Sequence, residues 1–164
     1  MAYYFEPLSH NDRKPVIDIF NYFIEKTFAA FPEKKVGYDF FDLLLEVTQG
    51  YPAITVKDHS GQIFGFAFLR PYHKMETFRR TAEITYFIMP EHTRKGIGAA
   101  ILDQFFEKAK GLNIDSILAS ISSINETSIH FHLKYGFKEC GRFLKIGRKF
   151  GKDFDVVWMQ KQLA

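Results

Sequence analysis

The chain has 164 residues, of which 46% are hydrophobic and 25% are charged, as in globular proteins that bury a single core. The net charge of +3, from 22 basic and 19 acidic residues, does not by itself indicate a polyanionic partner. The single cysteine, Cys140, excludes an internal disulfide and favours a reducing compartment. Because the sequence contains neither an apolar span of ~20 residues nor a signal-peptide pattern, we expect a cytoplasmic protein with no membrane partner.

The first half of the chain predicts a strand, two helices and a hairpin. AYYFEPLS at residues 2–9 is typical of a strand, and FFDLLLEVTQ at 40–49 predicts a short helix. Between them, apolar residues recur every three or four positions and so form one helix face: Val16, Ile19, Phe20, Phe23 and Ile24. AITVKD and IFGFAFLRP predict a hairpin, because β-forming runs flank the glycine-containing connection HSGQ.

The second half alternates strands with two helices. One helix carries apolar residues at every fourth position, namely Ile97, Ile101, Phe105 and Ala109, and Gly111 is its expected C-cap. The other begins at Asn125, a favourable N-cap, and stops at Gly136. Four β-rich runs complete the half: TAEITYFIMP at 81–90, DSILASI at 115–121, FKECGRFLKIG at 137–147 and FDVVWMQ at 154–160. We therefore predict one mixed α/β domain over residues 1–164, not a doubly wound repeat.

The segment RKGIGA places Gly96 and Gly98 at the mouth of a helix, directly after Arg94 and Lys95. The first N–H groups of a helix lack intrahelical partners and the macrodipole adds positive charge there, so such a turn can cradle a phosphate. The third glycine of a dinucleotide fingerprint and the Gly-Lys-Ser/Thr end of a Walker loop are both missing. A tight strand–helix turn without a ligand is the alternative that the glycines alone leave open.

Together with the preceding strand and with NETSIHFHLKYGF at 125–137, RKGIGA resembles the GCN5-related N-acetyltransferase superfamily. The resemblance spans most of the chain and implies a central, mostly antiparallel sheet of about seven strands flanked by helices. It implies acetyl-CoA as co-substrate, with the pyrophosphate held at Arg94, Lys95, Gly96, Ile97, Gly98 and Ala99. It also implies that the pantetheine arm lies along the backbone of Tyr86, Phe87 and Ile88, and that Asn125 touches the cofactor while capping its helix.

A closer resemblance is to the phosphinothricin or methionine sulfoximine N-acetyltransferase branch. It is carried by TAEITYFIMPEHTRKGIG, SIHFHLKYGF and GRKFGKDFDVVWMQ. The branch implies direct acetyl transfer to the amine of a small amino-acid-like compound, without a metal and in a homodimer. Another amine class (a polyamine, an aminoglycoside or a protein N-terminus) and a non-catalytic CoA-binding domain are the alternatives. Nucleic-acid binding ranks last, because the net charge is modest and no nucleic-acid motif is present.

Glu83 interrupts an otherwise apolar strand. Burial towards an acceptor cleft would raise its pKa into the range of a useful general base, whereas alternation along the strand favours a solvent-facing position. The branch resemblance implies that this glutamate acts on the amine, directly or through water. The same resemblance places His132 where many of these enzymes carry a tyrosine that protonates the leaving thiolate, and histidine suits proton transfer at neutral pH. Its role as acid, base or mere organiser stays open.

Acceptor contacts are expected from Glu83, Ile84 and Thr85. Shortly before its glutamate the branch carries an Arg-Pro-Phe-like acceptor segment, and this chain has other residues at that place, which we expect to contact the acceptor: His73, Lys74 and Met75. RPY occurs slightly earlier, at residues 70–72, so either the loop is realigned or the acceptor differs. Arg79 and Arg80 would bind an acceptor carboxylate or serve as ordinary loop charge. The basic run at 142–152 favours a solvated strand and turn over a nucleic-acid surface, and the branch resemblance implies that this region helps to frame the acceptor pocket and the dimer contact.

Overall fold

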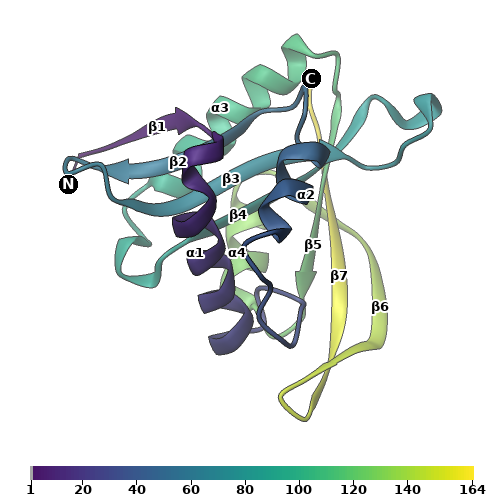
Figure 1. Ribbon diagram of the computed structural model, residues 1–164. Helices are drawn as coiled ribbons and strands as arrows, with labels where there is room; N and C mark the ends of the chain where they lie inside the picture. The colour runs from purple at the N-terminus through teal and green to yellow at the C-terminus, as the bar shows by residue number, and fades with distance from the viewer. Residues whose placement is uncertain (1) are drawn as a thin grey trace.

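A seven-stranded sheet in the order β1-β2-β3-β4-β5-β7-β6 forms the centre of the computed structural model, which describes residues 2–164 (Figure 1). Every neighbouring pair is antiparallel except β4 with β5, which confirms the mostly antiparallel sheet implied by the resemblance. The strands are β1 (Tyr3–Pro7), β2 (Ala53–Asp58), β3 (Ile63–Pro71), β4 (Thr81–Ile88), β5 (Ser116–Ser122), β6 (Lys138–Lys149) and β7 (Lys152–Gln162).

Two pairs of helices cover the two faces of the sheet (Figure 1). On one face lie α1 (Arg13–Lys26) and α2 (Phe40–Val47), and on the other lie α3 (Ile97–Gly111) and α4 (Glu126–Lys134). Three short 3-10 helices lie in connections, at His10–Asp12, Glu76–Phe78 and Pro90–His92. The order of elements is the one that the sequence predicts, and it yields a mixed α/β fold.

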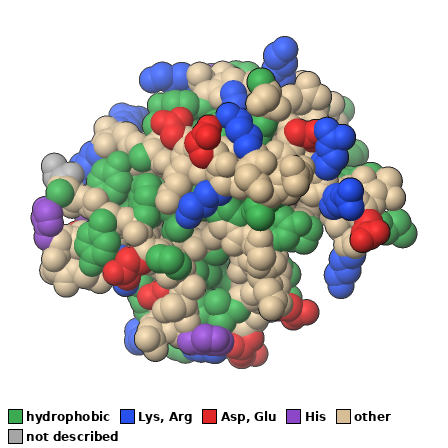
Figure 2. Space-filling model, turned by 90° about the horizontal axis from the view of Figure 1, so that it is seen from above, with side chains coloured by type: hydrophobic (Ala, Val, Ile, Leu, Met, Phe, Trp, Pro, Cys, Tyr) green, Lys and Arg blue, Asp and Glu red, His purple; other side chains and the backbone are tan. Residues whose placement is uncertain are grey.

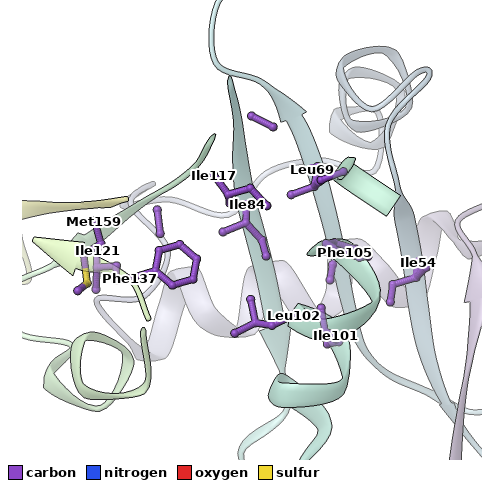
Figure 3. Close-up of a cluster of buried hydrophobic side chains, with 14 of the residues drawn as sticks. Ile54, Leu69, Ile84, Ile101, Leu102, Phe105, Ile117, Ile121, Phe137 and Met159 are labelled. Carbon is purple, nitrogen blue, oxygen red and sulfur yellow. The ribbon is translucent and has the colours of Figure 1, made fainter. Parts of the chain in front are cut away.

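Hydrophobic periodicity divides the core between these two faces. Figure 3 shows Ile101, Leu102 and Phe105 of α3 packed against the sheet, where Ile84 of β4 and Ile117 of β5 meet them. The opposite face forms a second, Phe-rich cluster with α1 and α2. Burying one such side chain stabilises the fold by about 1.5–3 kcal/mol, so the alternation of strand residues fixes which face each one occupies.

The parallel pair β4–β5 separates partway along its length. Pairing with β5 covers only Thr81 to Glu83, whereas the ladder with β3 continues to Ile88. Strand β5 meanwhile stays paired with β7 as far as Ser122. The edge of β4 beyond Glu83 therefore faces a gap in the sheet, and this gap positions the site described below.

Two local boundaries differ from the sequence prediction. Gly111 is the last residue of α3, and Asn113, at φ 59°, adopts the left-handed conformation that was expected of a C-cap glycine. Strand β6 continues past Gly147 to Lys149, which pairs with Lys152 across the turn. The basic run is therefore mostly strand, and its pairing register shifts between Phe143 and Gly147.

Candidate active site

A cavity of about 350 Å³ lies at the gap between β4 and β5. Its α1–α2 side is lined from α1, α2, the segment between them, and β3. Its α3–α4 side is lined by residues 119–122 of β5 and by Asn125, Ser128 and His132 at α4. Strand β4 runs between the two sides and contributes residues 83–87. The cavity therefore joins both faces of the sheet through the point where its strands separate.

Glu83 lies in this cavity and is 8% exposed. Its cross-strand neighbour in the β3–β4 register is Arg70, and the Arg70 guanidinium forms an ion pair with the Glu83 carboxylate. Burial raises the pKa of Glu83, and the positive charge of Arg70 opposes that rise. A general-base role for Glu83, which stays a prediction, requires such a buried position. The side chain of Arg70 is 46% exposed and so keeps contact with solvent.

His132 is 3% exposed on α4 and makes a hydrogen bond at each ring nitrogen. Its Nδ1 lies 2.7 Å from the Ser128 carbonyl oxygen, and its Nε2 lies 2.8 Å from the Tyr86 hydroxyl. Because a carbonyl only accepts, Nδ1 carries the proton and Nε2 accepts from Tyr86. Burial lowers the pKa of His132 and raises the pKa of Tyr86, so both groups are neutral near pH 7.

The side chain of Tyr86 is therefore a site group that sequence reasoning missed, since only its backbone was expected to contribute. Tyr86 lies on the α3–α4 side of β4, and its ring also contacts Phe131 of α4 edge-on, with centroids 6.2 Å apart. A tyrosine in a β-rich run is ordinary core composition. Its partner on α4 is set by tertiary packing, so no local signal marks it.

The glycine turn before α3 has a separate structural reason for each glycine. Gly96 is the N-cap and has a φ of 81°, a left-handed conformation that favours glycine. A Cβ at Gly98 would lie 3.0 Å from the ring of Phe131 in α4, so the close packing of the two helices favours glycine there. Arg94 and Lys95 are exposed beside the turn, and the Lys95 ammonium donates to the Glu91 carbonyl. The first turn of α3 thus presents backbone N–H groups and positive charge together.

Other predicted site residues fall into two groups. Ile84, Thr85 and Phe87 line the cavity, as does Asn125, whose side chain also accepts a hydrogen bond from the Ser128 backbone as the N-cap of α4. The structure does not bring the other group to the cavity. His73, Lys74 and Met75 are exposed in the β3–β4 loop, which projects from the body of the molecule in Figure 1. Arg70 of the RPY segment does line the cavity, as a realigned acceptor segment would require.

Lys149 lies in the basic run and is only 1% exposed, unlike the solvated side chains that the run by itself favours. Its ammonium donates to the carbonyls of Thr27 and Ala30, at 2.7 Å each. These carbonyls belong to the segment between α1 and α2, of which residues 29–32 line the cavity. Lys149 therefore anchors one wall of the cavity from a distant part of the chain, in the region that the branch resemblance implies to frame a pocket.

Several basic side chains form ion pairs with acidic neighbours. Arg142 and Arg148 pair with Asp155 and Asp153, and Arg80 pairs with Asp115. Figure 2 shows Lys and Arg side chains interspersed with acidic and apolar ones on the face viewed from above. Across residues 2–164, no cluster of three or more His, Cys, Asp or Glu side chains could hold a metal ion. None of the described helices is both long and apolar enough to cross a membrane.

The fold and this site define an N-acetyltransferase. Residues 16–137 match the family model described as the Acetyltransferase (GNAT) family, which covers more than half of the sequence. The chain therefore belongs to the GNAT family, as the resemblance in the sequence indicated.

Similarity to individual proteins extends over nearly the whole chain. A relative from Pseudomonas aeruginosa named L-methionine sulfoximine/L-methionine sulfone acetyltransferase is 30% identical over 93% of this chain and 90% of its own. The phosphinothricin N-acetyltransferase of Streptomyces coelicolor is 26% identical over 96% and 94%. A Salmonella typhimurium structure solved with its cofactor acetyl-CoA has a TM-score of 0.91 at 26% identity, covering 100% of this chain and 95% of that one.

Proposed function

We propose that the protein transfers the acetyl group of acetyl-CoA directly to the α-amine of a small amino-acid-like acceptor. The observation that carries the proposal is the Arg70–Glu83 ion pair inside the cavity. An amino acid presents an amine and a carboxylate one carbon apart, and the pair offers a carboxylate and a guanidinium side by side. The half-exposed guanidinium has further N–H donors for an acceptor carboxylate. The names of the relatives, which refer to amino-acid analogues, agree with this acceptor class.

The residues present fit acetyl-CoA at the gap between β4 and β5. The unpaired edge of β4 at Tyr86, Phe87 and Ile88 offers backbone groups to the pantetheine arm. The pyrophosphate would bind at the first turn of α3, with Arg94, Lys95, Gly96, Ile97, Gly98 and Ala99, and Asn125 would face the arm from α4. When bound, acetyl-CoA supplies an activated acetyl thioester, and the chain needs no nucleophile of its own.

In this proposal Glu83 removes the proton of the attacking amine. A free α-amine titrates near ~8, so a carboxylate with a pKa raised by burial suffices as a base. His132 is neutral, and its Nε2 accepts from the Tyr86 hydroxyl, an arrangement that supports an organising role. His132 thereby holds the Tyr86 side chain against the α3–α4 side of the cavity.

Release of the CoA thiol from acetyl-CoA tests the proposal across amino acids, methionine sulfoximine, phosphinothricin, polyamines and aminoglycosides. We expect release with amino-acid-like acceptors. Among the described residues that line the cavity, Glu83 is the only Asp or Glu, so a polycationic acceptor would find one carboxylate where it needs several. Binding of acetyl-CoA without release by any amine would instead identify a non-catalytic CoA-binding domain.

We also propose that two copies associate through the β6–β7 hairpin and that the protein works in the cytoplasm, where Cys140 would stay reduced. The shifted register of β6 leaves three large apolar side chains 55–75% exposed: Phe143, Leu144 and Ile146. Clustered exposed apolar side chains are typical of protein interfaces. Light scattering should give a dimer mass for the protein and a monomer mass for Leu144→Glu; a monomer at all concentrations would overturn the dimer.

A further inference from the structure

Apolar side chains make up the α1–α2 side of the cavity almost entirely. They come from α1, from the segment between α1 and α2, from α2 and from β3, and include Phe20, Phe31, Phe40, Leu43, Phe66 and Phe68. Among the described residues of this side and of β4, the ionisable groups that reach the cavity are Arg70, Glu83 and Tyr86. The Arg70–Glu83 ion pair thus lies beside a long apolar surface.

Aromatic packing holds this surface in one arrangement. Phe20 of α1 stacks on Phe40 of α2, with ring centroids 5.6 Å apart, and also contacts Phe87 of β4 at 5.5 Å. Phe66 of β3 meets the same Phe87 ring at 5.5 Å. These contacts link four elements (α1, α2, β3 and β4) through their rings, so the wall is formed before an acceptor arrives.

Phe31 extends the wall at the rim of the cavity. Its ring stacks on Phe154 of β7, with centroids 6.0 Å apart, and its backbone follows the segment that Lys149 anchors. Leu43 lies on α2 and is 47% exposed at the cavity edge. The apolar surface therefore runs from the buried ion pair out to solvent. It offers a path for the side chain on the α-carbon of an acceptor whose α-amine reacts.

This charge distribution decides which amino-acid side chains fit. The α-amine and α-carboxylate of an acceptor would engage Glu83 and Arg70. A phosphinate or carboxylate at the end of the side chain would then lie against aromatic rings, without a second cation to compensate its lost hydration. A hydrocarbon or thioether side chain loses no comparable hydration and gains from burial.

We propose that the acceptor is an amino acid with an uncharged, apolar side chain, of the leucine, methionine or phenylalanine class, and that the cavity rejects acceptors with an anionic side chain. This inference rests on the proposed function and narrows it. The inference predicts different outcomes for two compounds that appear in the names of the relatives. Methionine sulfone has a neutral side chain and should be accepted, whereas phosphinothricin has an anionic side chain and should be rejected.

Acceptor kinetics at saturating acetyl-CoA test the inference. We expect kcat/KM for L-phenylalanine, L-methionine and L-leucine to exceed that for phosphinothricin and L-glutamate at least 100-fold. Phosphinothricin within tenfold of the best apolar amino acid would overturn the inference and leave the proposed function standing. Release with none of these amino acids would overturn the proposed function, and the inference with it.

A matched pair of variants tests whether the apolar wall is the cause. Leu43→Lys places a cation at the rim, and should lower the ratio of kcat/KM for phenylalanine over phosphinothricin at least tenfold. Leu112→Lys makes the same change at a residue of equal exposure outside the cavity, 46% against 47%, and should leave the ratio unchanged. Equal ratios in both variants, with acetyl-CoA binding retained, would show that the wall does not select the acceptor.

Discussion

The two sides of the cavity are built in different ways. The α3–α4 side is lined by residues 119–122 of β5 and by Asn125, Ser128 and His132 at α4, and the glycine turn that begins α3 lies on the same face of the sheet. The α1–α2 side collects side chains from residue 20 to residue 87 and is held by Lys149, which donates to carbonyls more than 100 residues away along the chain. Backbone groups suit a ligand that many enzymes share, whereas side chains are needed to select one acceptor. The two sides differ accordingly in how widely their residues are spread along the sequence.

Replacing Glu83, the proposed base, should give the largest difference between the effect on acceptor turnover and the effect on acetyl-CoA binding. Glu83→Gln should lower kcat/KM about 10²–10⁴-fold because the amine loses its proton acceptor, while acetyl-CoA affinity stays within about twofold. Stopped assays and calorimetry measure the two quantities. Glu76→Gln, in the exposed β3–β4 loop, is the control and should change neither. Loss of acetyl-CoA binding in Glu83→Gln would mean that the two sides do not act independently.

Gly98→Val is the corresponding disruption of the α3–α4 side. The added side chain would press on the Phe131 ring, so we expect the free energy of unfolding to fall by about 1–3 kcal/mol and acetyl-CoA binding to weaken. Urea denaturation gives the first value and titration calorimetry the second. Gly111→Val, at the other end of α3, meets no atom within 4 Å and serves as the comparison. Equal losses in both variants would refute the packing argument.

Lys149→Met should affect the α1–α2 side alone. Two backbone carbonyls lose their donor, each hydrogen bond being worth about 1–3 kcal/mol when a charged group makes it, so the segment at 27–32 should loosen. We expect the acceptor KM to rise about tenfold, which corresponds to ~1.4 kcal/mol, with unchanged acetyl-CoA affinity. Lys152→Met changes an exposed lysine of the same hairpin and should leave the acceptor KM as it is.

The smallest expected effect is a pH dependence of stability. Because burial lowers the pKa of His132, the unfolded chain binds more protons than the folded one as pH falls through the ordinary histidine range. The protein should therefore lose free energy of unfolding from pH 7 to pH 5, by at most ~1.4 kcal/mol per pH unit from this group. His132→Gln should flatten the slope, whereas His130→Gln, on the exposed neighbour, should not. Parallel slopes in all three proteins would exclude a buried neutral His132.

Sequence patterns predicted the elements well because each depends on local periodicity. The spacing of Val16, Ile19 and Phe23 defines α1, and Asn125 and Gly136 bound α4 as expected. Glu83 was harder, since alternation alone favoured a solvent-facing position, and its burial follows from tertiary packing. Arg70 was seen as part of RPY, but its place beside Glu83 follows from strand register, which no local signal states.

The glycine turn has structural reasons that the sequence pattern did not state. Two glycines before a helix suggested room for a phosphate, yet Gly96 is explained by its positive φ and Gly98 by the ring of Phe131. Both explanations agree with a phosphate site, and neither requires one. Contacts such as Gly98 with Phe131, Tyr86 with His132 and Lys149 with Thr27 join distant segments, so they arise only once the chain has folded.

The place of β7 in the sheet determines which part of the site can form first during synthesis. This last strand lies between β5 and β6, and Lys149, which closes the acceptor wall, directly precedes the turn that leads into it. During synthesis the glycine turn leaves the ribosome long before either of them. A nascent chain can therefore present its helix mouth early, yet its selectivity for the acceptor is completed only when the final hairpin folds back onto segments made first.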